Sequence, residues 1–394
     1  MESLVIREYT QELYEGIWDI ESRDYEQDYD SDEVLEKLNA PDFFRPFSER
    51  LLAFYNEVLN SNYTVDEARA DLTRRAKQGI SRGTITNWFS GKGEPKYGDD
   101  DRQRVFAVAF AIELDAKQTE RLFHKVFLDK AFNKRNVHEF IYLYCINHRK
   151  PLSVAEKRIS QLGKTSEINL PADQTQLTQY LADAAEKGMD ESALLKFIAE
   201  HPHNFSLNNT SAKEHRKKLL DKLTIGSESS PGLAEQEYER RRSEIADDKE
   251  SASGFSGKDK TSVDFLLYMI MGIDLVQKKN DEVLSIRERF QRKEINNQFP
   301  DKQTLSMKDP SSYVLRKDII LLYFYSYWIK DYLENQSRGN YDGFANELNG
   351  VLFECGFSPL YYGNPYDWLF LYCSACADDN YKPLDRFRGI LTQD

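Results

Sequence analysis

The sequence is poor in proline, glycine and cysteine, and each shortage restricts the fold. With 12 prolines and 19 glycines among 394 residues, few segments are interrupted, and strand-like alternation is rare, so the pattern predicts an all-α protein. Four cysteines are too few for a disulfide framework in a chain of this length, and we expect reduced thiols. No segment approaches the ~18 consecutive apolar residues of a membrane span, and the first residues lack the basic start and apolar run of a signal peptide. These absences predict a cytoplasmic protein without a membrane partner.

Sequence motifs typical of the common enzyme classes are also absent. The sequence has no P-loop, no G-x-S-x-G elbow, no H-E-x-x-H zinc motif and no Rossmann glycine fingerprint, and its six histidines lack metal-ligand spacing. One C-x-x-C joins Cys373 to Cys376. The matching position in a repeat described below, Cys145, has no such partner, which favours a buried helix face over a metal site. We therefore expect no enzyme activity, catalytic residue, metal or cofactor.

The spacing of apolar residues predicts helices along most of the chain. They span residues 47–60, 65–78, 82–90, 101–113, 116–128, 137–147, 153–161, 174–187, 191–200, 212–223, 233–245, 263–276, 282–295, 313–334, 341–354, 366–377 and 384–391. A hydrophobic share of 40% and an aromatic share of 13% are enough to give these helices two or three cores.

The segment from Ser81 to Lys96, S-R-G-T-I-T-N-W-F-S-G-K-G-E-P-K, carries the most informative pattern in the chain. Ser81 is a good N-cap for a helix that starts at Arg82, because its hydroxyl can accept from backbone N–H groups of the first turn. Apolar residues recur at i, i+3 and i+4 on one face, at Ile85, Trp88 and Phe89. Gly91 then allows the left-handed conformation that closes a helix, and Pro95 prevents its resumption.

A second helix is predicted immediately upstream. Thr64 and Glu67 have the spacing of a capping box, in which each side chain satisfies the other residue's orphan backbone N–H. Helical spacing continues from there to Gln78, and Gly79 marks a tight turn before Ser81. Two helices joined by a glycine-containing turn form the helix-turn-helix arrangement of DNA-binding proteins.

These residues resemble the lambda-repressor-like family of helix-turn-helix proteins, also called Cro-like or XRE, across about residues 46–128. The second helix of that family often reads S-R-x-T-I-S-x-W-E-x-G, followed by a K-x-x-P turn. The matching residues here are Ser81, Arg82, Thr84, Ile85, Trp88, Gly91, Lys92 and Pro95. The segment from Arg104 to Asp115 is similar to the next helix of the family. The resemblance implies sequence-directed binding to double-stranded DNA by a homodimer.

The resemblance also implies roles for individual residues. The base-reading positions correspond to Arg82, Gly83 and Asn87. Because Gly83 has no side chain, base readout would depend chiefly on Arg82, positioned for a guanine edge, and Asn87, positioned for an adenine edge. Phosphate contacts are expected from the basic and hydroxyl residues around them, namely Arg74, Arg75, Lys77, Thr84, Thr86, Lys92 and Lys96.

Two alignments of the first helix are open. Aligning Gly79 with the turn glycine of the family places Arg74, Arg75 and Gln78 where small or apolar core residues are expected. Placing Leu72 and Ala76 in the core instead lengthens the turn by two residues. The second alignment predicts an unusual docking of the first helix.

Charge is distributed very unevenly along the chain. The net charge is −13, of which residues 1–45 carry −10, whereas residues 74–96 carry +5. A local basic patch is what DNA binding requires. The acidic, tyrosine-containing run from Glu21 to Glu33 suggests the hypothesis that this segment masks the basic helix in cis. The alternative is a solvated extension that aids solubility.

The ends of the chain contain a weak internal repeat. Asn136–Cys145 and Asn364–Cys373 align without gaps at an offset of 228 residues, and each is followed by a K-P-L segment and a capped helix. This pattern predicts a repeated helical hairpin, whose copies pack on each other or mediate dimerisation. Chance similarity between short apolar helices is the alternative.

These patterns predict five regions and one function. The regions are an acidic extension (1–45), a helix-turn-helix domain with extra helices (46–160), a charged helical region (161–246), a flexible linker (247–261) and an aromatic-rich helical domain (262–394). We expect a transcriptional regulator that binds double-stranded DNA as a homodimer and responds to a protein or small-molecule effector. The alternative is a helical adaptor in which the helix-turn-helix serves as a scaffold for protein contacts.

Overall fold

The computed structural model confirms the all-α fold class. It describes residues 31–40, 44–95, 98–133, 136–162, 185, 190–201, 210–227, 230–245, 259–271, 290, 295, 298–300, 305, 314–334, 339–375 and 382–392. These residues form helices, with one isolated bridge between Ser227 and Ser230. By their contacts they divide into two compact units. One comprises the described residues of Arg45–Lys213 and Phe353–Ser358, and the other those of Met1–Phe44, Glu214–Leu352 and Pro359–Asp394.

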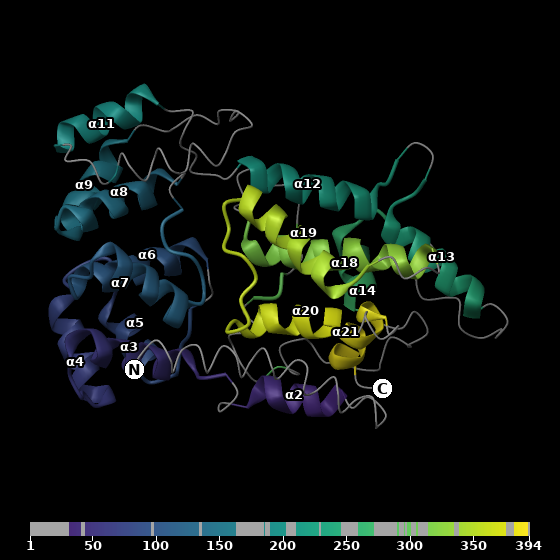
Figure 1. Cartoon of the computed structure of the whole chain (residues 1–394), viewed down its shortest axis with the longest axis horizontal. Helices are drawn as coiled ribbons and strands as arrows, with labels where there is room; N and C mark the ends of the chain where they lie inside the picture. Colours follow the sequence, from purple (N-terminus) through teal and green to yellow (C-terminus); the bar gives the residue numbers. More distant parts are fainter. Residues whose placement is uncertain are drawn as a thin grey trace. The chain divides into compact units, whose positions relative to one another are not determined.

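The first unit, called here the α3–α11 unit, contains the segment with the helix-turn-helix pattern (Figure 1). Its helices are α3 (Phe47–Leu59), α4 (Val65–Arg75), α5 (Arg82–Phe89), α6 (Asp99–Ala111), α7 (Ala116–Leu122) with the π-helical η1 (Phe123–Phe127), α8 (Val137–Asn147), α9 (Leu152–Gln161) and α11 (Glu191–Glu200). Side-chain caps explain where several of these helices begin. Thr64 and Asp115 form capping boxes, and Asn136 and Asp190 accept from first-turn N–H groups.

Aromatic rings join these helices into one core. The ring of Phe106 on α6 lies 4.5 Å from that of Phe123 on η1 and 5.0 Å from that of Tyr142 on α8. On the other side of the unit, Phe47 of α3 contacts Trp88 of α5 edge to face, at 5.2 Å between centroids. Such pairs stabilise beyond simple area burial, so α5 is anchored to the rest of the unit by its apolar face.

The second unit, called here the α12–α21 unit, also begins with a helix from the acidic extension. Its elements are α2 (Ser31–Asn39), α12 (Thr210–Thr224), α13 (Leu233–Ile245), α14 (Val263–Met271), α18 (Arg316–Glu334), α19 (Tyr341–Glu354), α20 (Pro365–Ala375) and α21 (Pro383–Thr392). Phe324 of α18 contacts the rings of Phe344, Phe370 and Phe387 from α19, α20 and α21. Helix α2 packs against α21 (Figure 1) and buries Val34 and Leu38.

Several expectations lie outside the described residues. They are residues 1–30 of the acidic extension with most of its masking run, most of the helices expected at 174–187 and 282–295, residues 247–258 of the linker, Lys96 and Cys376. Where the expected helices are described, most ends agree to within three residues. The expected helix at 116–128 contains a π-helical turn, η1, in which Phe123, Val126 and Phe127 are buried.

The two hairpins that the sequence predicts to be a repeat begin with the same type of cap. Before α8, Asn136 Oδ1 accepts from the backbone N–H groups of His138 and Glu139 at 3.0 and 3.3 Å. Before α20, Asn364 Oδ1 accepts from the backbone N–H of Tyr366 at 2.9 Å. Asparagine is a strong N-cap because its short side chain reaches these otherwise unpaired donors.

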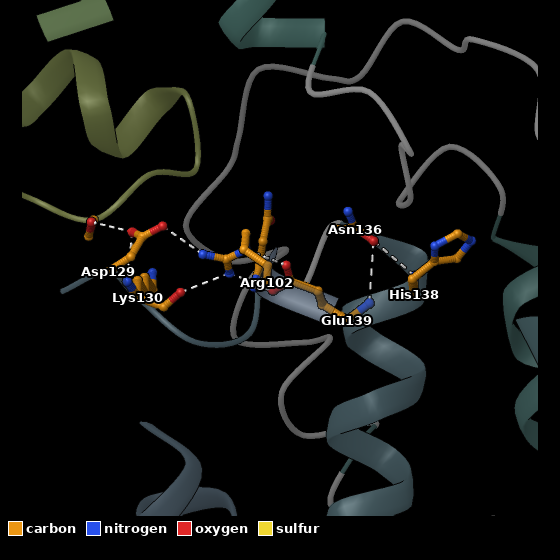
Figure 2. A network of polar contacts seen from close by, with 8 residues as sticks. Arg102, Asp129, Lys130, Asn136, His138 and Glu139 are labelled. Atoms are coloured by element: carbon orange, nitrogen blue, oxygen red, sulfur yellow. Dashed lines mark hydrogen bonds and ion pairs between the residues drawn. The ribbon is translucent and has the colours of Figure 1, made fainter. Parts of the chain in front are cut away.

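An acid three residues after each asparagine binds an arginine from an earlier helix. Glu139 accepts from Arg102 of α6, at 2.8 Å between Nε and Oε1, and Figure 2 shows Arg102 lying between Glu139 and Asp129. Asp367 accepts from Arg316 of α18, at 2.7 Å between Nη1 and Oδ1. Each unit therefore contains one hairpin whose first helix is tied to an earlier helix of that unit by an ion pair to an acid that is at least 92% buried.

Candidate nucleic-acid interface

Helix α5 has the cap and the buried stripe that its sequence predicts. Ser81 Oγ accepts from the backbone N–H of Thr84 at 3.0 Å, and its own backbone is extended. The apolar side chains are almost fully buried, with exposed fractions of 1% for Ile85, 3% for Trp88 and 2% for Phe89. This burial fixes the rotation of α5 about its axis and leaves its opposite face outward.

The outward face of α5 is polar and made of short side chains. Gly83, Asn87 and Ser90 recur at i, i+4 and i+7 and are exposed. Arg82 is exposed at the first turn, and neither its guanidinium nor the Asn87 amide is hydrogen-bonded to another described residue. Short side chains at the centre of the face let the helix backbone approach a groove closely, with polar groups left to contact what lies there.

A turn that contains Gly79 joins α4 to α5. Helix α4 ends at Arg75 and α5 begins at Arg82. Leu72 is fully buried and Ala76 packs partly buried against the core. Gly79 has a φ of +81°, and a Cβ there would come within 2.7 Å of core side chains on α6 and α9. Only glycine fits both this backbone conformation and this close approach.

Two of the residues expected to contact phosphate, Arg74 and Arg75, also take part in an internal network. Arg74 and Arg75 both bind the carboxylate of Asp71, which also accepts from the Tyr55 hydroxyl at 2.7 Å. Burial opposes the ionisation of Asp71, but these hydrogen bonds outweigh it and hold its pKa below the ordinary range. One carboxylate compensates only one of the two guanidinium charges, and the Arg74 side chain is 76% exposed. The network joins Asp71 and both arginines at the end of α4 to Tyr55 of α3.

The other expected phosphate contacts lie around α5. Lys77 in the turn and Lys92 after the helix are exposed, whereas Thr84 and Thr86 are half-buried. The Thr84 hydroxyl lies 2.9 Å from that of Ser81, so it takes part in the cap. Lys77, Arg82 and Lys92 supply positive charge near the polar face, and Arg74 and Arg75 together keep the one positive charge that Asp71 leaves uncompensated.

The exit from α5 folds back on the helix. Gly91 takes a φ of +67°, as expected for a closing residue. The backbone N–H of Gly93 then donates to the carbonyl of Asn87 at 3.2 Å, and a Cβ on Gly93 would lie only 3.1 Å from that of Asn87. The turn thus packs beside Asn87 and limits the directions in which its amide can extend.

The structure also contains a polar cavity that the sequence did not indicate. It has a volume of about 690 Å³, and it is lined by Tyr144, His148, Lys150, Arg158, Asp190, Glu191 and Ser192. Glu191 binds the guanidinium of Arg158 and lies 3.8 Å from the ammonium of Lys150. The charged side chains that line the cavity therefore largely compensate one another. No sequence signal could have found this cavity, because its residues come from helices that meet only in the folded unit.

Cysteine and histidine side chains form no cluster suited to a metal among the described residues. Cys145, Cys355 and Cys373 are buried and form no disulfide, which confirms the buried helix faces expected for Cys145 and Cys373. Burial raises the pKa of Cys145 and that of Cys355 to about 12, so neither is a reactive thiolate at neutral pH.

Within the part of the chain that the structure describes, no helix has the length and apolarity needed to traverse a bilayer.

Two ion pairs, one between Arg102 and Glu139 and one between Arg316 and Asp367, were missed in the sequence. The two acids nevertheless stand at equal positions of the aligned repeat.

A search with protein-family models, with curated proteins and with solved structures found nothing that matches this chain.

Proposed function

We propose that this protein is a cytoplasmic transcriptional regulator that binds double-stranded DNA through α5. The observation that carries the proposal is the outward face of α5, where Gly83, Asn87 and Ser90 leave the backbone accessible and Arg82 extends from the first turn. A helix of this length fits the major groove, and arginine and asparagine are the side chains best suited to guanine and adenine edges there.

The surrounding charge supports the same proposal. Lys77 and Lys92 are exposed on either side of α5, in the turn before it and in the turn after it. Positive groups that flank a recognition helix contact the two phosphate backbones and fix its register without reading sequence. A homodimer would present two copies of α5 to half-sites about one helical turn apart.

A second candidate function is a protein-binding adaptor. The observation that favours it is the engagement of Arg74 and Arg75 by Asp71, which compensates one of the two positive charges that these arginines would bring to DNA binding. In that case the exposed face of α5 would contact a protein partner, and duplex DNA would bind only weakly.

Binding of the full-length chain to duplex DNA distinguishes the two functions. Selection from a random duplex library, followed by fluorescence anisotropy across a salt series, measures both affinity and the number of phosphate contacts. We expect the double substitution Arg82→Ala and Asn87→Ala to cost ~1–3 kcal/mol for each bidentate base contact on a selected sequence.

The matched control for this experiment is Arg104→Ala. Arg104 lies on α6 of the same unit and pairs with Asp101 at 2.6 Å, so the control removes one arginine without altering α5. It should leave the affinity for the selected sequence nearly unchanged. Equal binding by the α5 double variant and the unaltered chain, or affinity that does not fall with salt, would reject the DNA-binding proposal.

A further inference from the structure

The polar cavity of the α3–α11 unit has a volume of about 690 Å³, which lies within the ~300–1,000 Å³ of small-molecule sites. Its wall is formed by the end of α8, the loop after it, α9 and the first turn of α11. Arg158 donates from Nε and Nη2 to one oxygen of Glu191, Oε2. The other oxygen, Oε1, lies 3.8 Å from the ammonium of Lys150, which is longer than a hydrogen bond. A donor and an acceptor therefore face each other across a gap.

Two further polar groups of the wall lie at the start of α11. Asp190 accepts at Oδ1 from the backbone N–H of Ala193 at 2.7 Å, and its Oδ2 accepts from no described residue. The exposed hydroxyl of Ser192 has no hydrogen bond to a described residue either. The groups left to a ligand by the described residues are thus an ammonium that only donates, two carboxylate oxygens that only accept, and a hydroxyl that does both.

The charges of the wall disfavour an ionic ligand. The two cations, Lys150 and Arg158, balance the two carboxylates, Asp190 and Glu191. The hydrogen bonds from Arg158 hold the pKa of Glu191 below its usual range, so this balance is kept at neutral pH. An anion bound to Lys150 would also meet Glu191, and a cation bound to Glu191 would also meet Lys150. A neutral group that both accepts and donates avoids either repulsion.

We propose that this cavity binds a small, uncharged, polyhydroxylated molecule of the size of a monosaccharide. One ligand hydroxyl would accept from Lys150 and donate to Glu191 Oε1, bridging the 3.8 Å gap. Other hydroxyls would donate to Asp190 Oδ2 and bond to the hydroxyl of Ser192. A sugar ring supplies several hydroxyls at fixed spacing, and hydrogen bonds from a hydroxyl to a carboxylate are short and strong.

The wall of the cavity connects directly with the turn before α5. Lys150 stands two residues before Leu152, the first residue of α9. The Leu152 side chain packs against Gly79 so closely that a Cβ added to that glycine would lie 2.6 Å from Leu152 Cδ2. Gly79 in turn stands two residues before Ser81, the N-cap of α5. A close-packed contact of this kind passes a displacement on, because it has no space to absorb one.

A ligand that ties Lys150 to the first turn of α11 would therefore act on α5. The loop between α8 and α9 moves toward the ligand, and Leu152 follows, since only Pro151 separates it from Lys150. The ligand is then an effector that changes the affinity for duplex DNA, by ~5-fold or more for a typical coupling. This regulatory part rests on the function proposed for α5, whereas the binding of the ligand does not.

NMR of the full-length protein tests binding in the absence of DNA. The backbone amide signals of Lys150 and Ser192 report on the cavity. The neutral probes are D-glucose, D-galactose, D-ribose and myo-inositol, whose hydroxyls are arranged differently, and the charged contrasts are acetate and glycine. We expect saturable shifts at both residues with at least one neutral probe and none with acetate or glycine. No saturable shift with any neutral probe, or an equal response to acetate, overturns the proposal.

Variants of the cavity wall make the test specific. Lys150→Gln and Ser192→Ala change exposed positions, so both chains should fold. Each should weaken binding of the responding probe by ~2–10-fold, as one hydrogen bond is lost. The matched control is Lys196→Gln, because Lys196 also lies on α11 but pairs with Glu200 at 3.7 Å outside the cavity wall. Unchanged affinity in both cavity variants, or an equal loss in the control, overturns the site.

The amide signals of Gly79 and Arg82 test the connection to α5. They should move together with those of the cavity when the probe binds. Leu152→Val removes one carbon from the contact with Gly79 and should reduce their shifts, while the shift at Lys150 stays. Shifts confined to the cavity overturn the effector role.

DNA affinity with and without the responding probe completes the experiment. We expect the probe to change the affinity of the unaltered chain for a selected duplex and to change that of Lys150→Gln less. A chain that binds the probe but no duplex rejects the function proposed for α5 and leaves the cavity site standing. A chain that binds the duplex but none of the neutral probes rejects the cavity site alone, so the two proposals fail separately.

Discussion

Glu139 and Asp367 stand 228 residues apart and occupy the same place in two copies of one local structure. Each acid binds an arginine from an earlier helix, and each also accepts from the backbone N–H of the residue six positions before it, at 2.6 Å from Asn133 and 2.9 Å from Tyr361. The left-handed residues Leu128 and Gly356 have the same separation, with φ values of +58° and +74°. Agreement in backbone conformation as well as in side-chain contacts is not expected of two unrelated apolar helices.

The first prediction concerns these two acids. Glu139→Gln should destabilise the α3–α11 unit, and Asp367→Asn the α12–α21 unit, by ~1–3 kcal/mol each, because a buried arginine then loses part of its charge-assisted hydrogen bonding. Amide hydrogen exchange measures the loss of stability in each unit separately. Faster exchange should appear in α8 for the first variant and in α20 for the second. Loss of protection spread equally over both units would contradict the assignment.

The second prediction compares two glycines near α5. Gly79→Ala should cost ~2–4 kcal/mol, because it combines a left-handed backbone with contact against Ala107 and Leu152. Gly83→Ala should instead stabilise α5 by up to ~1 kcal/mol, since its nearest neighbour, Ser81 Oγ, lies 3.7 Å away and alanine favours helix. Urea unfolding of both variants measures the difference. A stabilising Gly79→Ala would show that the turn is looser than described.

The third prediction is a dependence on pH that comes from Asp71. Its pKa is lowered in the folded chain, so its contribution to stability is present above the unfolded pKa of about 4 and is lost as the pH falls through the folded value. Asp71→Asn should therefore lower the free energy of unfolding at pH 7 by ~1–3 kcal/mol and flatten its fall toward pH 3. The free energy of unfolding in urea at each pH is the measurement.

Asp66→Asn is the control for that experiment. Asp66 pairs with Arg69 on the same helix, but its side chain is 80% exposed, and exposed pairs contribute little. Its free energy of unfolding should stay close to that of the unaltered chain at both ends of the pH range. An equal effect of the two substitutions would mean that the contacts with Tyr55, Arg74 and Arg75 do not set the behaviour of Asp71.

The fourth prediction separates the cations around α5 by their partners. Lys77→Ala should weaken binding to every duplex alike and reduce the slope of log affinity against log salt by ~0.9, as one phosphate contact is lost. Arg75→Ala should change that slope less, because Asp71 holds the Arg75 guanidinium by a hydrogen bond and shares its charge between Arg74 and Arg75, while the substitution lowers the stability of the unit. Anisotropy titrations at several salt concentrations give both slopes. A larger change of slope for Arg75→Ala than for Lys77→Ala would mean that Arg75 leaves Asp71 to contact DNA.

Local signals were sufficient to predict most of the helices. The capping serine and threonine set the starts of α5 and α4, and the spacing of Ile85, Trp88 and Phe89 predicted the buried face of α5. These features depend on residues within one or two turns of each other, whose geometry is nearly independent of the rest of the fold. The end of α4 was less well predicted. Its last turn stops at Arg75, because Gly79 docks against α6 and α9.

The charges of the candidate interface could not be predicted in the same way. A count of charged residues predicts a uniform basic patch from Arg74 to Lys96. In the folded chain, Tyr55 contacts Asp71, and Asp71 binds two of the arginines in that count. Which of these cations are available to an outside ligand depends on residues that lie outside residues 74–96. The helix-turn-helix pattern was therefore visible in the sequence, and the strength of its electrostatics was not.

By itself the sequence determined the helical class, the caps of α4 and α5, the polar outward face of α5 and the positions of the repeated hairpins, because each depends on the spacing of residues along one segment. The tertiary structure alone decided that Tyr55 of α3 meets Asp71 of α4, and that Lys222 meets Ser326 across 104 residues of sequence. Contacts of that kind depend on how helices pack, and packing is set by the combined burial of many side chains and not by any single segment.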